Sequence, residues 1–379
     1  MFRKRFHLLT FAGIPIGIDI SWFLIAIFLT WTLAAGHFPY LYPGLPLGSY
    51  WLMGLGGMLG LFICIILHEL GHALVAKRYK LPVLQITLFI FGGIAELKKE
   101  PKSPLVEFLV AIAGPIVSVL LAMFFYTVSQ FGELNKWPIT ITGVTYYLAL
   151  INALIVAFNL VPAFPLDGGR ILRSILWGWK KNLAWATKIT TQMGAGFGFF
   201  LLFFGIFSLI SGNFITGVWF IILGLFLQRT AIASQTRFYV GKELKEEKVS
   251  KFMKTNLDSV SPDITIKDLI DHHVYQSHHH LYPITQNDRL IGYITLQEIK
   301  TVPAEDWDRT LVKNLMQPLS KGQLVSPHTN ALDALEQVNQ APFPTLFVLE
   351  DDRFIGLLTA QDLLKLISLK LALEGAPKY

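Results

Sequence analysis

Charged side chains and cysteine are both scarce in this sequence of 379 residues. Asp, Glu, Lys and Arg together make up only 15% of it, whereas 53% of the residues are apolar. Soluble domains carry about 25% charged residues, so this composition predicts a membrane protein with room for a second domain. The single cysteine, Cys64, excludes an internal disulfide, and we interpret it as a small apolar packing residue.

The net charge of +6 does not require a nucleic-acid partner. The basic residues lie at the ends of apolar segments, where the positive-inside rule accounts for them, so we predict no nucleic-acid binding. Loops rich in Lys and Arg alternate with loops that hold few bases. Six spanning helices with both termini in the cytoplasm satisfy this alternation and predict a multi-pass protein of the cell membrane. We expect these helices near residues 20–35, 51–76, 105–128, 144–161, 190–210 and 214–227.

The second of these segments carries the run His68-Glu69-Leu70-Gly71-His72. On a helix, His68 and His72 lie one turn apart on one face, so both imidazoles can reach one metal ion. Glu69 lies beside them, close enough to take a proton from a metal-bound water. Ionisable groups inside a membrane helix are costly and usually functional. The pattern therefore predicts a metal site, and the alternative is that the histidines merely pack between helices.

A catalytic zinc takes three protein ligands and keeps one position open. The other carboxylates of the membrane half lie at helix ends or in loops, namely Asp19, Glu96, Glu100, Glu107 and Glu133. Asp167 is the best candidate for the third ligand, because proline precedes it and glycine follows it, and such a stretch can turn a carboxylate inward. The alternative is that Asp167 caps the next helix near Arg170.

Residues 83–97 are rich in Ile, Leu and Phe and contain Gly92-Gly93. The segment is too short and too interrupted to span a bilayer. We predict a strand or hairpin that lies within the protein at membrane depth, because extended backbone is tolerated there only where protein or water shields it.

With these residues the sequence resembles the site-2 protease family of intramembrane zinc metalloproteases. The resemblance covers roughly residues 1–230 and rests on His68 to His72, Gly114-Pro115, and Asn159 through Gly168. It implies that His68, His72 and Asp167 bind one Zn²⁺ and that Glu69 is the catalytic acid/base. It also implies hydrolysis of peptide bonds within or near transmembrane segments of proteins in the lipid bilayer, such as an anti-sigma factor or another membrane-tethered regulator.

The same resemblance suggests how a substrate is positioned. It places Asn159 near the scissile peptide. It also suggests that residues 83–97, with Gly92 and Gly93, hold a locally unwound substrate by edge pairing. The family often has an asparagine a few residues after the Gly-Pro pair, where this chain has Ser118.

After Arg229 the composition changes, and an internal repeat follows a charged segment. Residues 288–298 match residues 352–362 at an offset of about 64, and each copy reads turn, strand, Gly-x-x-Thr-x-x-acid, helix. We therefore predict four parts: a membrane-embedded domain (1–236), a linker (237–248) and two repeat modules (249–308 and 309–379).

The repeat resembles a tandem pair of CBS modules, which often bind adenine nucleotides. The resemblance implies that Thr295 and Thr359 face phosphate or ribose, and that Glu298 and Asp362 face ribose hydroxyls. ATP, ADP or AMP would then regulate the protease. A structural module that forms a homodimer without any ligand is the alternative. The expected fold is a polytopic α-helical membrane protein with a short β segment, followed by a cytoplasmic α/β tandem CBS module.

Two other functions compete with proteolysis. One is a membrane transporter gated by the CBS pair, with the histidines lining an ion path. The other is a non-catalytic protein that binds membrane proteins. Transport gives no reason for Glu69 between the histidines or for the separate Asp167, and the complete ligand set argues against a non-catalytic binder.

Overall fold

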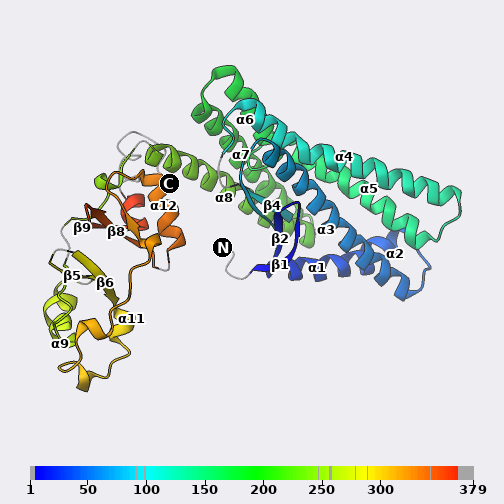
Figure 1. Cartoon of the computed structure of the whole chain (residues 1–379). Coiled ribbons are helices and arrows are strands. Elements are labelled where there is room, and N and C mark those ends of the chain that lie inside the picture. The colour runs from blue at the N-terminus through cyan, green and yellow to red at the C-terminus, as the bar shows by residue number, and fades with distance from the viewer. Residues whose placement is uncertain are drawn as a thin grey trace. The chain divides into compact units, whose positions relative to one another are not determined.

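The computed structural model describes residues 5–90, 92–97, 100–245, 247–255, 258–277, 279–287, 289–341 and 343–365. The chain forms two compact units, Met1–Gln235 and Thr236–Tyr379 (Figure 1). Four of the bases behind the predicted alternation of loops lie outside the described residues, namely Arg3, Lys4, Lys98 and Lys99, and so does Asp288, the first residue of the repeat match.

The first unit is mainly helical. Its helical segments are α1 (Ser21–Thr32), a π-helical turn (Leu33–His37), α2 (Phe38–Leu41), α3 (Leu47–Arg78), α4 (Pro104–Leu134), α5 (Ile139–Asn159), α6 (Asp167–Lys180) and α7 (Leu183–Ile210). α8 (Phe214–Lys245) begins in this unit and ends in the second. Among the described residues, six helical stretches are long and apolar enough to span a membrane, which confirms the predicted number. They are Ser21–Leu41, Leu47–Arg78, Pro104–Leu134, Ile139–Asn159, Leu183–Ile210 and Phe214–Gly241.

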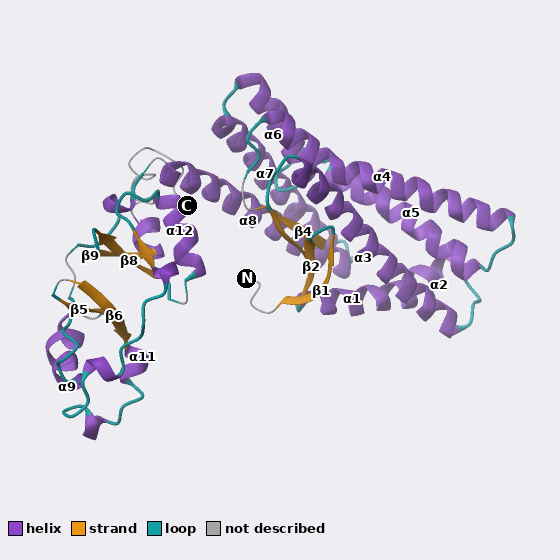
Figure 2. Cartoon of the chain, in the orientation of Figure 1, coloured by secondary structure: helices purple, strands orange, loops and turns teal. Residues whose placement is uncertain are grey.

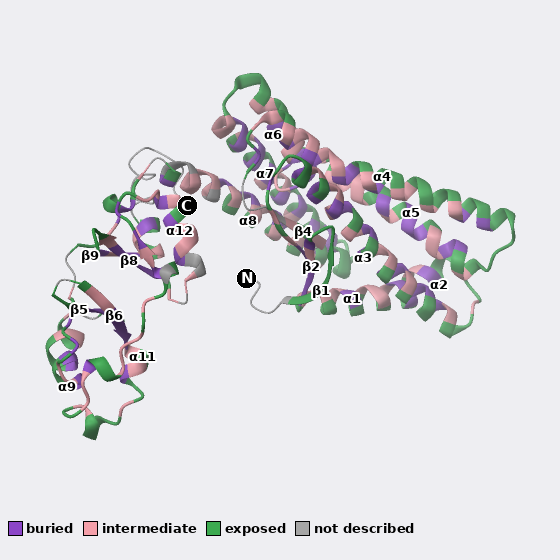
Figure 3. Cartoon of the chain, viewed as in Figure 1, coloured by how far each residue is buried: buried purple, intermediate pink, exposed green. Residues whose placement is uncertain are grey.

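The helices are longer than the apolar runs from which they were predicted. α3 has 32 residues and is therefore about 48 Å long, against about 30 Å for the hydrocarbon core of a bilayer. Polar and aromatic residues at both ends continue the helix beyond the apolar run. Large apolar side chains such as Leu52, Ile63 and Phe203 are exposed. Figure 3 shows that exposed positions recur along the helices of the first unit. Such apolar side chains suit lipid contact and would be unfavourable in water.

A four-stranded sheet accompanies the helices (Figure 2). It contains β1 (Arg5–Phe11), β2 (Ile14–Asp19), β3 (Val83–Phe89) and β4 (Gly92–Leu97), in that order across the sheet. β1 and β2 are antiparallel, β2 and β3 are parallel, and β3 and β4 are antiparallel. The hairpin predicted for residues 83–97 is therefore confirmed. The N-terminal hairpin was not predicted, although Ala12-Gly13 between two apolar runs is a hairpin signal, and both residues have positive φ.

The sheet packs against α3, the helix that carries the two histidines. Ile14, Ile16 and Ile86 of the sheet form one buried cluster with Leu70 and Ala73 of α3. A second cluster joins further residues of the sheet to α1 and α3, namely Ile18, Leu88, Ala26, Met58 and Phe62. This packing holds the sheet beside the middle and C-terminal half of α3.

The second unit contains two small hydrophobic cores, each built around a β-hairpin. The first hairpin is β5 (Leu281–Gln286) and β6 (Arg289–Thr295), followed by α11 (Leu296–Ile299). The second is β8 (Thr345–Glu350) and β9 (Arg353–Thr359), with β7 (Leu324–Val325) parallel to β8 and α12 (Ala331–Gln340) packed beside them. Shorter helices complete the unit: α9 (Ile266–Leu269), α10 (Tyr275–Ser277) and several π or 3-10 turns.

The segment that opens each repeat packs into the hydrophobic core of the other repeat. Val249 and Phe252 pack into the core of the second hairpin, whereas Val312 packs into the core of the first. An apolar cluster that includes Tyr293 and Phe347 joins the two sheets, and their ring centroids are 5.5 Å apart. The two repeats therefore form one intertwined α/β pair.

Candidate metal centre

The structure brings Asp167 to the two predicted histidines, which precede it by more than 90 residues. His68 and His72 on α3 are 4% and 5% exposed, and Asp167 is the first residue of α6. Asp167 Oδ2 lies 3.1 Å from His68 Nε2 and 3.2 Å from His72 Nε2. The two Nε2 atoms are 3.2 Å apart. Among the described residues, this is the one group of three or more His, Cys, Asp or Glu side chains that could hold a metal ion.

The other ring nitrogen of each histidine is held by α4. His72 Nδ1 donates to the carbonyl oxygen of Val110 at 2.7 Å, and His68 Nδ1 lies 2.8 Å from Ser118 Oγ. Because a carbonyl oxygen only accepts, a neutral His72 carries its proton on Nδ1 and turns the lone pair of Nε2 toward His68 and Asp167. Partners of this kind fix the tautomer and ring orientation of metal-binding histidines.

These distances fit a zinc ion. Ligand atoms about 2.0–2.1 Å from a tetrahedral zinc are about 3.3 Å from one another, close to the separations between the three atoms here. Two imidazole lone pairs and a carboxylate that point at one another would repel unless a cation or a proton lies between them. Two nitrogens and one oxygen are also ligands that zinc accepts, and three protein ligands leave a position open.

Gly114 leaves the space in which the two imidazoles meet. A Cβ at this position would lie 2.1 Å from His72 Nε2 and 2.6 Å from His68 Nε2. Gly168 and Gly169 permit a similarly close approach after Asp167. A Cβ on Gly168 would lie 2.3 Å from the carbonyl oxygen of Leu160. Gly114 therefore lets the backbone of α4 lie directly against the centre, whereas Gly168 and Gly169 let the start of α6 pack on the backbone of residues 160–164.

The side chain of Glu69, a residue of α3, contacts β4. Its Oε2 accepts a hydrogen bond of 3.1 Å from the backbone N–H of Ala95. A Cβ on Gly93 would be 2.8 Å from Glu69 Cγ, so glycine is needed for this approach. Gly92 opens β4 with a φ of +129°, a value that favours glycine.

Glu107 and Asp19 are not among the three converging residues and have other partners. Glu107 is buried in an ion pair with Arg173, and Asp19 accepts hydrogen bonds from the backbone and hydroxyl of Ser21. The alternative role of Asp167 as a helix cap is not seen, because Leu166 is the N-cap residue and no side chain caps α6. Asn159, the last residue of α5, is half-buried and is not one of the three converging residues.

Several supporting residues were not predicted from the sequence. Ser118, Val110, Glu107 and Arg173 contact either the candidate ligands or one another. One signal could have identified part of this set, since Glu107 and Ser118 are polar residues on the apolar helix that carries Gly114. The contact of His72 with the backbone carbonyl of Val110 could not be predicted from the sequence, because every residue has such a carbonyl.

The four predicted nucleotide-binding residues form two helix caps. The hydroxyl and backbone N–H of Thr295 both donate to Glu298 Oε2. Thr359 makes the same pair of bonds to Asp362 Oδ2, and Lys254 Nζ lies 2.9 Å from Asp362 Oδ1. Each acid is thus engaged at the start of its own helix, an arrangement that stabilises the fold with or without a nucleotide.

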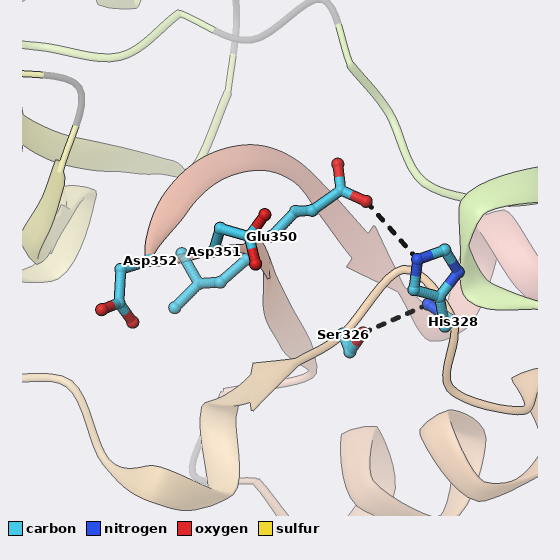
Figure 4. A pocket seen from close by; sticks show the side chains of 6 residues that line it. Ser326, His328, Glu350, Asp351 and Asp352 are labelled. Atoms are coloured by element: carbon cyan, nitrogen blue, oxygen red, sulfur yellow. Dashed lines mark hydrogen bonds and ion pairs between the residues drawn. The ribbon is translucent and has the colours of Figure 1, made fainter.

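An acidic hollow lies elsewhere in the second unit (Figure 4). Its lining residues are Ser326, His328, Leu349, Glu350, Asp351 and Asp352, and His328 Nε2 is 3.5 Å from Glu350 Oε1. None of the four predicted nucleotide-binding residues lines it. A negatively charged hollow does not favour a nucleotide phosphate.

Models of two protein families match the chain. The model of peptidase family M50 matches residues 56–137 and 133–205, a region that contains both histidines and Asp167. The CBS domain model matches residues 249–305 and 312–369.

Relatives match nearly the whole chain. The protein sll0528 of Synechocystis sp., named as a zinc metalloprotease, is 31% identical over 93% of this chain and 93% of its own length. Rip3 of Mycobacterium tuberculosis, also named as a zinc metalloprotease, is 29% identical over 97% of this chain and 94% of its own length. Among solved structures, the site-2 protease from Methanocaldococcus jannaschii is 32% identical with a TM-score of 0.44, and covers 61% of this chain and 95% of that chain.

Proposed function

The chain belongs to peptidase family M50 and is an intramembrane zinc metalloprotease with a CBS pair, and we propose that His68, His72 and Asp167 hold its zinc and that Glu69 is its acid/base. The observation that carries this proposal is the convergence of three ligand atoms at 3.1–3.2 Å from one another. α4 binds Nδ1 of both histidines, so Nε2 of each ring remains available for the metal.

The chemistry follows from the residues around the zinc. When bound, zinc supplies a Lewis acid that polarises a peptide carbonyl and makes a water molecule more acidic. Glu69 accepts the proton of the attacking water and then returns a proton to the leaving amide nitrogen. The hydrogen bond from Ala95 holds the Glu69 carboxylate beside β4. This contact supports the proposed role of Glu69, because it holds the carboxylate on the helix of the two histidines and beside an outer strand.

The outer edge of β4 is suited to binding an unwound substrate. β4 is an outer strand of the sheet, and the N–H of Ala95 points toward Glu69 instead of pairing with β3. The backbone groups of this edge therefore lie beside the acid/base. A transmembrane segment that unwinds near its scissile bond can add to such an edge by main-chain hydrogen bonds. Gly92 and Gly93 keep this edge free of bulky side chains.

The packing of α3 on α5 supports a role for Asn159. A Cβ on Gly57 would contact Tyr147, and one on Gly60 would contact Leu148. The two helices therefore run parallel, with facing positions offset by about 88–90 residues. If the same register continues for three turns, Asn159 is level with residues 69–71, which supports the proposed role. At that level its amide can hydrogen-bond the backbone of a bound substrate.

The substrates, the orientation and the regulation of the protease belong to the same proposal. We infer that it cleaves membrane-tethered proteins, such as an anti-sigma factor. We also infer that it lies in the cell membrane with both termini in the cytoplasm. The basic loops support this orientation. Adenine nucleotide at the CBS pair would regulate cleavage, and the pair would form a homodimer. What supports nucleotide binding is the CBS match and the cation Lys254 beside Asp362.

The decisive experiment compares wild type with Glu69→Gln. Purified protein is assayed for zinc content and for cleavage of a single-span model substrate in detergent. We expect zinc in both preparations and a loss of at least about 100-fold in cleavage for the variant, because amide cannot transfer the proton. Equal cleavage by both proteins would exclude Glu69 as the acid/base. Absence of zinc from wild type would exclude the metal centre and favour a transporter or a non-catalytic binder.

A further inference from the structure

Glu107 and Arg173 form a buried ion pair that the catalytic chemistry does not use. Glu107 is 1% exposed and Arg173 is 4% exposed. Arg173 Nε and Nη2 lie 2.6 Å and 2.5 Å from Glu107 Oε1. The pair joins the first turn of α4 to α6, the short helix that begins with Asp167.

Glu107 belongs to one face of α4 that also supports both histidines. Residues 107, 110, 114 and 118 follow one another at helical spacings of three and four, so they share that face. Val110 binds His72, Gly114 leaves room for both rings, and Ser118 contacts His68. Glu107 extends the same face toward the third candidate ligand through Arg173.

Arg173 also contacts the segment that precedes Asp167. Its guanidinium lies over the ring of Phe164, 5.1 Å from the centroid. The backbone N–H of Phe164 donates to the carbonyl oxygen of Thr190 in α7. Arg173 therefore links α4, α6 and the turn that delivers Asp167, and loss of the pair would free α6 to shift or rotate.

We propose that Glu107 and Arg173 are positioning residues that set the place of Asp167 relative to the two histidines. This inference rests on the proposed role of Asp167 as a metal ligand. A buried ion pair contributes little to stability compared with a well-packed apolar pair, so stability alone gives weak reason for it. A directional contact at this point instead selects one register of α6 on α4.

The test replaces both charges at once, with Glu107→Leu and Arg173→Met in one protein, so that no buried charge is left unpaired. Zinc affinity is measured by chelator competition, and the ligand geometry by the visible absorption of Co²⁺ exchanged into the site. We expect a folded protein with a zinc affinity at least about tenfold below wild type and an altered Co²⁺ spectrum. A folded double variant with the affinity and spectrum of wild type would overturn the proposal.

Two further variants make the test decisive. Ser129→Ala removes a buried hydrogen bond between α4 and Thr142, far along the helix from Ser118, and should leave zinc affinity unchanged. A loss equal to that of the double variant would show a general weakening of α4 and overturn the proposal. If the double variant does not fold, Arg173→Lys decides, because it keeps the charge but not the fork of donors. It should lower zinc affinity, and an unchanged affinity would count against the pair.

The experimental result that contradicts this inference differs from the result that contradicts the proposed function. Wild-type protein without zinc contradicts the metal centre itself. Wild type with zinc, together with an unaffected double variant, contradicts only the positioning role of the pair.

Discussion

At the scale of single residues, the two histidines can meet only because position 114 carries no side chain. Even the methyl group of alanine at position 114 would lie within 2.6 Å of both Nε2 atoms, so the rings or α4 would have to move. Gly114→Ala should therefore abolish stoichiometric zinc binding and, with it, cleavage. Zinc content of the purified variant is the measurement.

Gly196→Ala is the matched control for that variant. Gly196 also lies in a membrane helix, α7, but a Cβ there would meet nothing within 4 Å. Alanine is the better helix former, so this variant should keep its zinc and be at least as stable as wild type. Zinc retained at wild-type affinity in Gly114→Ala would contradict the packing described for the centre.

The separate residues of the centre could be predicted to different extents. His68 and His72 follow from helical periodicity alone, because residues four apart share a face. The approach of Asp167 depends on how α6 packs, and its local surroundings indicated only that a turn was possible. Ser118 and Val110 meet the histidines through the register of α4 on α3, which no local pattern contains.

At the scale of elements, the contact between β4 and Glu69 can be tested through one backbone donor. Ala95→Pro removes the N–H that binds Glu69 Oε2. Proline is tolerated on an edge strand where the N–H does not pair within the sheet. We expect unchanged zinc content and a fall in kcat, because the acid/base loses the hydrogen bond that orients it. Single-turnover cleavage by the purified variant measures this fall.

Ala95→Ser keeps the backbone donor and serves as the control. It should cleave at a rate within a few-fold of wild type. If the proline variant cleaves as fast as the serine variant, the hydrogen bond to Glu69 has no catalytic role and β4 is only a structural strand.

Long apolar helices were easier to predict than the strands that accompany them. A run of about 20 apolar residues has few alternatives to a spanning helix, so the six helices follow directly. Their true ends lie in polar residues, which the apolar run does not mark. The N-terminal hairpin consists of two short strands, and β2 lies parallel to β3, which is distant in sequence. Such a pairing depends on tertiary structure, so the sequence indicated only the hairpin of residues 83–97.

At the scale of the whole molecule, the CBS pair either binds a nucleotide or serves only as a structural module. A ligand that binds the folded state raises the unfolding temperature. If Asp362 faces ribose, millimolar AMP, ADP or ATP should raise the unfolding temperature of wild type but not of Asp362→Ala, and should change the rate of substrate cleavage. Differential scanning fluorimetry of the full chain provides the measurement.

Asp362→Ala also removes a helix cap, and this effect must be distinguished from the loss of a contact with the nucleotide. Asp268→Ala removes a comparable capping box, with Thr265, outside the Gly-x-x-Thr motif. Both variants should be destabilised because each loses one half of its capping box, but Asp268→Ala should keep the nucleotide response. No response of wild type to any of the three nucleotides would favour the ligand-free structural module.

The orientation of the membrane unit can be tested because the chain has so little cysteine. Cys64 is 1% exposed inside α3, so a membrane-impermeant thiol reagent should react only with cysteines introduced at the surface. Lys136 and Lys181 form a matched pair. Both are exposed, and both have positive φ, at +55° and +51°, so cysteine meets the same backbone strain at each. Lys136 lies between α4 and α5, and Lys181 lies between α6 and α7.

The positive-inside rule assigns these two lysines to opposite sides of the membrane. Lys136 is the lone base in its loop, whereas Lys181 is flanked by Arg170, Lys180 and Lys188. In intact cells, Lys136→Cys should be labelled and Lys181→Cys should be protected until the membrane is opened. The reverse pattern would invert the proposed topology and place both termini outside the cytoplasm. Labelling of both in intact cells would contradict the passage of α5 through the bilayer, because α5 is the candidate membrane span that separates the two loops.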